Sequence, residues 1–158
     1  MAVGTLVDSP ARVLAKLLVD LGHVVDSTTV AWSVFVNDEP DKPDNAVTIY
    51  DTAGRLSSTG RVMSTGYRPG ARGILVRVRS ALPAAGWTRA NRIAAALDEE
   101  VEWETVNVGG TLYTVCAVTR TTDPVSIGDE SGTQRKLFTI NAVMTLKATS
   151  NSFAHPRI

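Results

Sequence analysis

The sequence predicts an α+β domain, in which a mostly antiparallel sheet of about five to six strands carries two helices packed on one face. Two stretches repeat apolar residues at helical spacing, and five others alternate apolar and polar residues as strands do. A pair of glycines inside one alternating stretch indicates a hairpin. Because this hairpin precedes one long final strand, we expect most neighbouring strands to run antiparallel.

The first helix is predicted over "SPARVLAKLLVDLG", residues 9–22. Ser9 suits the N-cap, Pro10 suits the first helical position, and Gly22 ends the run. The second helix is predicted over "LPAAGWTRANRIAAALDEE", residues 82–100, with Pro83 near its start. Each helix has one apolar side, which we expect to cover the sheet.

Strands are predicted over residues 29–38, 46–52, 73–81 and 134–148, and two more within 101–121 around the turn Gly109-Gly110. Along 73–81 the valines face the core, whereas Arg77 and Arg79 face out. The stretch "DPVSIGDESGT", residues 123–133, is predicted to be a turn-rich connection. We expect one domain over residues 1–150, followed by a polar C-terminal tail over 151–158.

The overall charge argues against a dedicated DNA-binding module, because 16 basic side chains balance 16 acidic ones. A single cysteine, Cys116, excludes a disulfide within the chain. Nothing near the N-terminus reads as a secretory signal, and no apolar run is long enough to span a bilayer. We therefore expect a soluble protein that is made in the cytoplasm and has no membrane partner.

The residues show no recognisable catalytic pattern. His23 follows a helix-ending glycine and is expected to be exposed or to cap the helix, and His155 lies in the polar tail. Cys116 lies in an apolar strand and is expected to pack in the core. The acidic stretch 38–44 lacks the glycine and the closing glutamate of a calcium loop. We predict no catalytic residue, no cofactor and no metal site.

Two oppositely charged loops are the candidate interaction surfaces. The loop 38–44 carries acids and the loop 53–72 carries arginines, and both flank the strand 46–51. Copies that close a ring offer different patches to their two neighbours, and opposite charge would orient them. The alternative is that both loops are simply solvated. The candidate subunit-interface residues are Asp38, Asp41, Asp44, Arg55, Arg61, Arg68 and Arg72.

Several segments together resemble the minor capsid or tail terminator (tail completion) proteins of tailed bacteriophages. They are "PDKPDNAVTIYDTAGR", "YRPGARGILVRVRSA", "TRANRIAAAL", "GGTLYTVCAV" and "RKLFTINAVMTLKA". The resemblance covers residues from about 10 to 147, and the stretch from Asp44 to Gly54 is its most specific part. The loop between Gly54 and Tyr67 is longer than the family pattern implies.

The resemblance implies a structural virion protein at the head–tail junction, synthesised in the host cytoplasm, and not an enzyme. Its copies would form a hexameric ring that caps the tail tube, and its partners would be the tube protein and the head connector or stopper. DNA would pass through the channel without sequence-specific binding. One alternative is a head–tail connector or stopper protein of the same virion. The others, from different classes, are a small ligand-binding or enzymatic domain and a nucleic-acid module.

Overall fold

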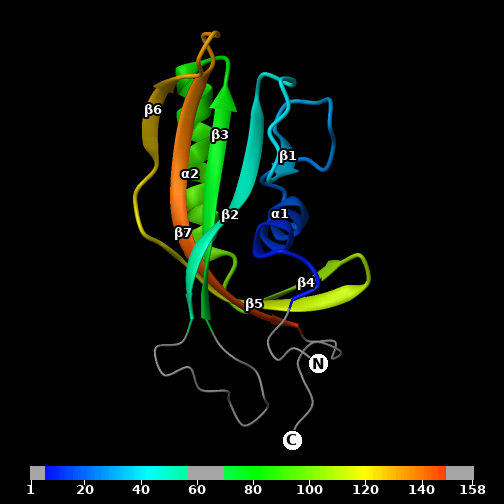
Figure 1. Ribbon diagram of the computed structural model, residues 1–158. Helices are drawn as coiled ribbons and strands as arrows, with labels where there is room; N and C mark the ends of the chain where they lie inside the picture. The colour runs from blue at the N-terminus through cyan, green and yellow to red at the C-terminus, as the bar shows by residue number, and fades with distance from the viewer. Residues whose placement is uncertain (1–5, 57–69, 149–158) are drawn as a thin grey trace, which may run out of the picture.

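A computed structural model describes residues 6–56 and 70–148 of the chain, and Figure 1 shows its elements in order. The described part contains two helices and one curled sheet of seven strands. The strand order is β1-β2-β3-β7-β5-β4, and β6 also pairs with β7. All strand pairs are antiparallel except β1 with β2. The predicted α+β class, with its mostly antiparallel sheet and two helices, is therefore confirmed.

The strands have bounds that differ in places from those expected. They are β1 (Ser33–Val36), β2 (Ala46–Leu56), β3 (Gly70–Ser80), β4 (Glu104–Val108), β5 (Thr111–Arg120), β6 (Val125–Asp129) and β7 (Lys136–Ala148). The strand β1 is shorter than the predicted 29–38, because Trp32 and Asn37 on either side of it adopt positive φ angles. Such angles interrupt extended backbone.

The helix α1 (Pro10–Asp20) begins where the sequence predicts, and two side chains satisfy its free N–H groups. The amide of Arg12 donates to Ser9 Oγ at 3.3 Å, and the amide of Ala11 donates to Asp51 Oδ1 at 2.9 Å. Asn37 orients Asp51, since its Nδ2 donates to Asp51 Oδ2 at 2.7 Å. Free amides and the helix dipole both favour a carboxylate at this position, so Asp51 fixes α1 to β2.

The helix α2 (Pro83–Glu99) packs closely on β7 through a glycine. A Cβ atom built on Gly86 would lie 2.5 Å from the ring of Phe138 and 2.8 Å from Cβ of Ser80. On the exposed side of the same contact, the rings of Trp87 and Phe138 have centroids 6.1 Å apart. Gly86 therefore sets the distance between α2 and the sheet.

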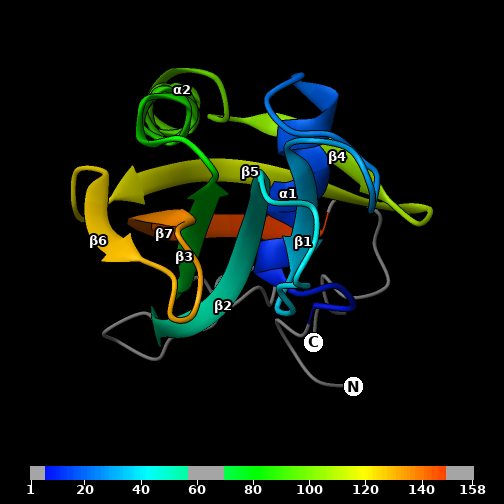
Figure 2. The same ribbon diagram turned by 90° about the horizontal axis from the view of Figure 1, so that it is seen from above.

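The core is one cluster, to which both helices and the sheet contribute. Val76 and Val78 of β3 are completely buried, as their alternation predicts. Figure 2 views the molecule from above and shows α1 next to the edge strands β1 and β4, with α2 on the other side of the molecule. The side chains Leu14, Leu17 and Leu18 of α1 are buried in this cluster.

One predicted connection is wrong. Residues 123–133 contain the strand β6, which pairs antiparallel with the first part of β7, from Val125↔Thr139 to Asp129↔Lys136. The strand β5 pairs with the later part of β7, from Arg120↔Ala142 onward. The chain therefore leaves β5, crosses residues 121–124, and resumes along the same side of β7. The glycine and proline content of the stretch hid this strand, because these residues usually mark turns.

Candidate subunit interface

Arg79 joins the loop 37–45 to the sheet. It faces out from β3 as predicted, yet it is only 1% exposed. Its guanidinium donates to the carbonyl oxygens of Asp41, Pro43 and Asp44 at 3.3, 2.6 and 3.4 Å. The carboxylates of Glu39 and Glu130 lie 3.9 and 3.6 Å from its Nη1. The loop therefore covers the outer face of the sheet around a buried cation.

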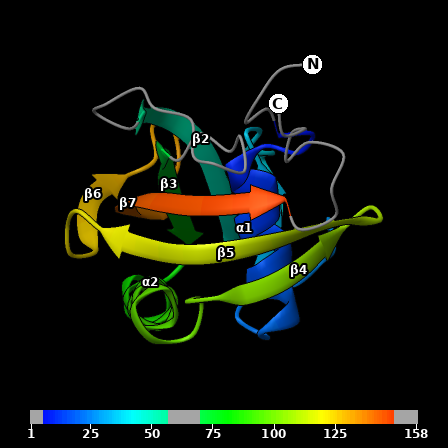
Figure 3. The ribbon, with the colours of Figure 1, turned by 90° about the horizontal axis from the view of Figure 1, so that it is seen from below.

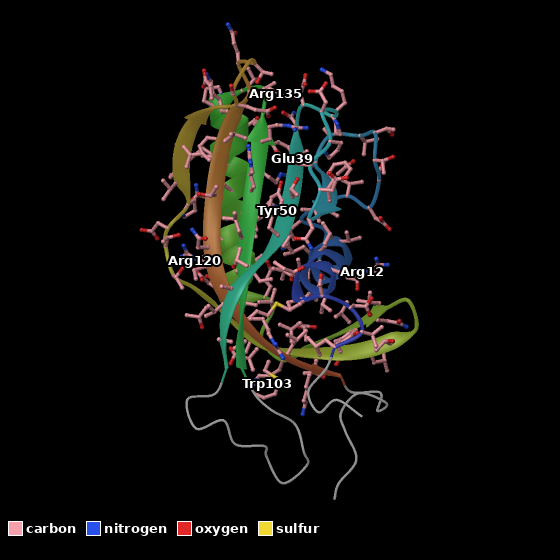
Figure 4. The ribbon with its side chains drawn as sticks, in the orientation of Figure 1. Arg12, Glu39, Tyr50, Trp103, Arg120 and Arg135 are labelled. Carbon is pink, nitrogen blue, oxygen red and sulfur yellow. The ribbon has the colours of Figure 1, made fainter. Side chains whose placement is uncertain are left out.

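Arg135 makes a second set of bonds to the same loop, from the turn between β6 and β7. It donates to Asp41 Oδ1 at 3.0 Å, to Glu130 Oε1 at 2.5 Å and to Asp44 Oδ1 at 3.3 Å, and also to the carbonyl of Asp41. Figure 4 shows Arg135 and Glu39 at the upper end of the sheet, where loop and turn meet. Hydrogen bonds between ionised groups are stronger than neutral ones, so these contacts fix the position of the loop.

These contacts also shift the ionisation of the groups involved. A hydrogen bond from Lys42, with a further contribution from Arg135, holds the pKa of Asp44 below its usual value. Burial alone would lower the pKa of Arg135, but hydrogen bonds to Glu130 and Asp41 raise it overall. Both groups are therefore charged at neutral pH, and their charges largely offset one another.

The predicted acidic patch is therefore not a surface of unpaired negative charges. Asp41 and Asp44 already serve as counterions within the chain, although the side chain of Asp41 remains 81% exposed. Asp38 is exposed at the start of the same loop. What the loop offers to a partner is a fixed shape with Asp38 and Asp41 at its surface, and only a small net negative charge.

The described ends of the predicted arginine loop, residues 53–56 and 70–72, lie at the opposite end of the sheet from the acidic loop. The stretch 53–72 is partly strand, because β2 continues to Leu56 and β3 begins at Gly70. Arg55 pairs with Ala71 in the ladder, and Arg72 pairs with Met144. Arg61 and Arg68 lie outside the described residues.

The strand between the two charged regions is long. It has 11 residues, which at about 3.3 Å per residue separate its ends by roughly 35 Å. Figure 1 shows β2 running from the loop 37–45 at the upper end to the lower end of the molecule. Both regions flank one strand as predicted, but β2 extends to Leu56 where the prediction ended it at residue 52, so the strand is longer than expected.

His23 has a role that the sequence did not indicate. The side chain is only 8% exposed, whereas the sequence predicted that it would be exposed or would cap the helix. Its Nδ1 accepts a hydrogen bond from Arg92 Nε at 3.1 Å, and its Nε2 lies 2.7 Å from Glu100 Oε2. Arg89 stacks on Trp32 at 4.6 Å and donates to the carbonyl of His23 at 2.8 Å. Cations here suit the helix C-terminus, and together these bonds join the end of α1 to α2.

The side chains in the described part offer no obvious reaction centre. Cys116 is only partly buried, at a bulge of β5, and burial raises the pKa of its thiol. The hydroxyl of Tyr113 donates to Asp8 Oδ2 at 2.8 Å, which anchors the segment before α1. Across residues 6–56 and 70–148, no group of three or more His, Cys, Asp or Glu side chains could hold a metal ion. No helix within these ranges is long and apolar enough to cross a bilayer.

Comparison with known proteins identifies the family. A search of curated proteins matched none of them to this chain. A family model described as "Bacteriophage tail terminator protein" matches residues 15–148. The matched region runs from within α1 to the last residue of β7, and so includes the whole sheet. The chain therefore belongs to the bacteriophage tail terminator protein family, a family of structural components of the virion.

Proposed function

We propose that this protein forms a hexameric ring at the head-proximal end of the phage tail, where it caps the tube, stops its growth and joins it to the head connector. The family match over residues 15–148 carries this proposal. The balanced charge, with 16 basic and 16 acidic residues, supports a channel through which DNA passes without being held. We place the assembled ring at the head–tail junction and its synthesis in the host cytoplasm.

The division of the molecule into unlike surfaces supports a closed ring. Head-to-tail contacts between identical subunits need two different patches on each subunit. The loop with Asp38, Asp41 and Asp44 and the strands that carry Arg55 and Arg72 lie at opposite ends of β2. We propose that both ends contact other proteins in the virion. Arg61 and Arg68 belong to the same proposed set of interface residues.

Removing the gene from the phage tests the function. Without the protein, the tube has no signal to stop, so we expect tails of uncontrolled length that do not join heads. Electron microscopy of the lysate measures tail length and the fraction of tails joined to heads. Expression of the protein from a plasmid should restore both. Tails of normal length that fail only to join heads would instead indicate a connector or stopper protein.

A further inference from the structure

A pocket that carries two arginines lies between the segment before β1 and the first half of α2. It has a volume of about 340 Å³ and is lined by Trp32, Ala84, Ala85, Thr88, Arg89 and Arg92. None of these lining residues, all of which the structure describes, is acidic. The walls are therefore small apolar groups, one indole ring and one hydroxyl, and the charge of the pocket is positive.

Hydrogen bonds to the end of α1 hold both guanidinium groups in place. Arg89 Nη1 donates to the carbonyl of His23 at 2.8 Å. Arg92 Nε donates to His23 Nδ1 at 3.1 Å, and Arg92 Nη2 donates to the carbonyl of Gly22 at 3.2 Å. Figure 3 views from below the two helices that these bonds connect. The acceptors are two carbonyl oxygens and an imidazole nitrogen that carries no proton, so the bonds position two cations without neutralising them.

Neither of these arginines has a counterion in the part of the chain that the structure describes. Five other arginines there each contact a carboxylate, namely Arg12, Arg77, Arg79, Arg120 and Arg135. Glu100 pairs with Nε2 of His23 instead. Burial and the charge of Arg92 lower the pKa of Arg89. The two cations therefore repel each other, and an anion bound between them would relieve this repulsion.

Trp32 fixes the apolar wall of the pocket. The guanidinium carbon of Arg89 lies 4.6 Å from the centroid of its ring, and this cation–π contact orients the guanidinium. The amide of Trp32 donates to the carbonyl of Asn45 at 2.8 Å, and the residue has a φ angle of 64°, which bulky residues rarely adopt. The N–H groups that face the pocket are therefore pre-organised, which lowers the cost of binding a ligand.

A carboxylate on an aliphatic stem matches this pocket in charge and shape. Guanidinium N–H groups form strong paired bonds with the two oxygens of a carboxylate. The methylene groups of the stem would contact the ring of Trp32 and the methyl groups of Ala84 and Ala85. Duplex DNA is a poorer match, because its binding depends on many phosphate contacts along an extended basic surface. The chemistry of the pocket therefore favours an acidic side chain of a protein.

We propose that this pocket binds the carboxylate of a glutamate or aspartate side chain that a neighbouring protein of the tail supplies. Arg89 and Arg92 donate to its oxygens, and Trp32 covers its stem. The site itself stands on the contacts described above, whereas the choice of a tail protein as the source of the carboxylate rests on the proposed function.

Titration of the purified protein, followed by nuclear magnetic resonance, tests the site. The probe is N-acetyl-glutamate N-methylamide, whose only charge is its side-chain carboxylate, and its glutamine analogue is the neutral control. We expect saturable shifts of the Nε–H signals of Arg89 and Arg92 and of the indole N–H of Trp32. The dissociation constant should be millimolar, because one side chain buries little area. No saturable shift, or equal shifts with the glutamine analogue, would overturn the proposal.

Dimethyl phosphate, a singly charged mimic of the DNA backbone, separates the two sources of negative charge. It is titrated in the same way, and we expect it to bind more weakly than the glutamate probe because its methyl groups do not provide an aliphatic stem. Tighter binding of dimethyl phosphate would overturn the assignment of a protein carboxylate and would indicate a nucleic-acid contact.

A carboxylate built into the chain should block the pocket. Thr88 is exposed and lies four residues before Arg92, a spacing at which an acid pairs with a base on a helix. Thr88→Glu should abolish the shifts caused by the probe and should melt about 1–2 °C higher than Thr88→Gln. The charge control is Ala95→Glu, at an exposed site of α2 outside the pocket, which should keep the binding. Equal binding of the probe by the two glutamate variants would overturn the site.

Complementation of a phage that lacks the gene tests the partner. With Thr88→Glu the pocket is already occupied, so we expect the fraction of tails that are correctly capped and joined to heads to be severalfold lower than with Ala95→Glu. Equal complementation would overturn the assignment of a tail protein and would leave the proposed function standing. Absence of the wild-type protein from finished tails would contradict the proposed function, whatever the titration shows.

Discussion

The guanidinium of Arg79 donates to the carbonyl oxygen of Pro43 at 2.6 Å, across 36 residues of sequence. The bond joins the outer face of β3 to a loop that would otherwise have little regular structure. Because the charge is buried and the loop carbonyls surround it, the loop and the cation depend on each other. The shape of this end of the molecule therefore depends on Arg79, together with the bonds that Arg135 makes to the same loop.

Replacing Arg79 should destabilise the protein strongly. Arg79→Met removes the buried cation, and breaking a buried ion pair costs about 3–5 kcal/mol. Glu39 then keeps its ion pair with Arg77, and Glu130 keeps its ion pair with Arg135. Chemical denaturation measures the free energy of unfolding. Arg77→Met is the control, because Arg77 occupies the same face at 29% exposure and should cost much less. Equal losses in the two variants would show that the loop does not depend on Arg79.

A methyl group at Gly86 should disturb the contact between α2 and β7. Gly86→Ala forces a carbon to within 2.5 Å of the Phe138 ring, and overpacking of this kind costs about 1–3 kcal/mol. In an open helix the same change would stabilise. Combining it with Phe138→Leu should cost less than the sum of the two single changes, because the smaller side chain makes room. Additive losses, measured by thermal unfolding, would contradict the close packing.

Acid should weaken the ion pair between α2 and the end of β5. Hydrogen bonds from Arg120, at 2.9 and 2.8 Å, hold the pKa of Asp98 below its usual value. Since the folded pKa lies below the unfolded value of about 3.9, the stabilisation is complete above that value. It disappears as the pH falls through the folded pKa.

The variant Asp98→Asn isolates this contribution. Its stability should fall below that of the wild type at pH 7, and the two curves should converge in strong acid. Stability is measured by denaturation across the pH range. A difference that stays constant down to pH 2 would show that the charge of Asp98 contributes nothing.

Charge reversal at Arg61 and Arg68 should impair assembly and leave the fold intact. If these arginines contact a neighbouring protein, Arg61→Glu with Arg68→Glu replaces attraction by repulsion, and steering of association is lost. The purified variant should keep its thermal transition, while ring formation on tubes slows or stops. Unchanged assembly would remove both residues from the interface.

Capping residues and the periodicity of apolar side chains predicted the elements in which these signals are clear. Ser9, Pro10 and Gly22 marked α1 because capping is a local property, and the alternation in residues 134–148 marked β7. The strand β6 was missed because glycine and a neighbouring proline suggested a turn, while its partner β7 supplied the structure.

The candidate interface was harder to predict because its charges pair across long sequence separations. Asp41 and Arg135 are 94 residues apart, and nothing in either segment indicates the other. His23 and Glu100 are likewise 77 residues apart. The number of acidic residues in the loop 37–45 therefore overestimated the unpaired negative charge at its surface.

Cryo-electron microscopy of the intact virion tests the central claim most directly. The account predicts a single hexameric ring of this protein between the last ring of tube protein and the head connector, with the same contact repeated around it. A protein found along the tube, at the distal tip, or as an isolated copy far from the tube end would contradict it.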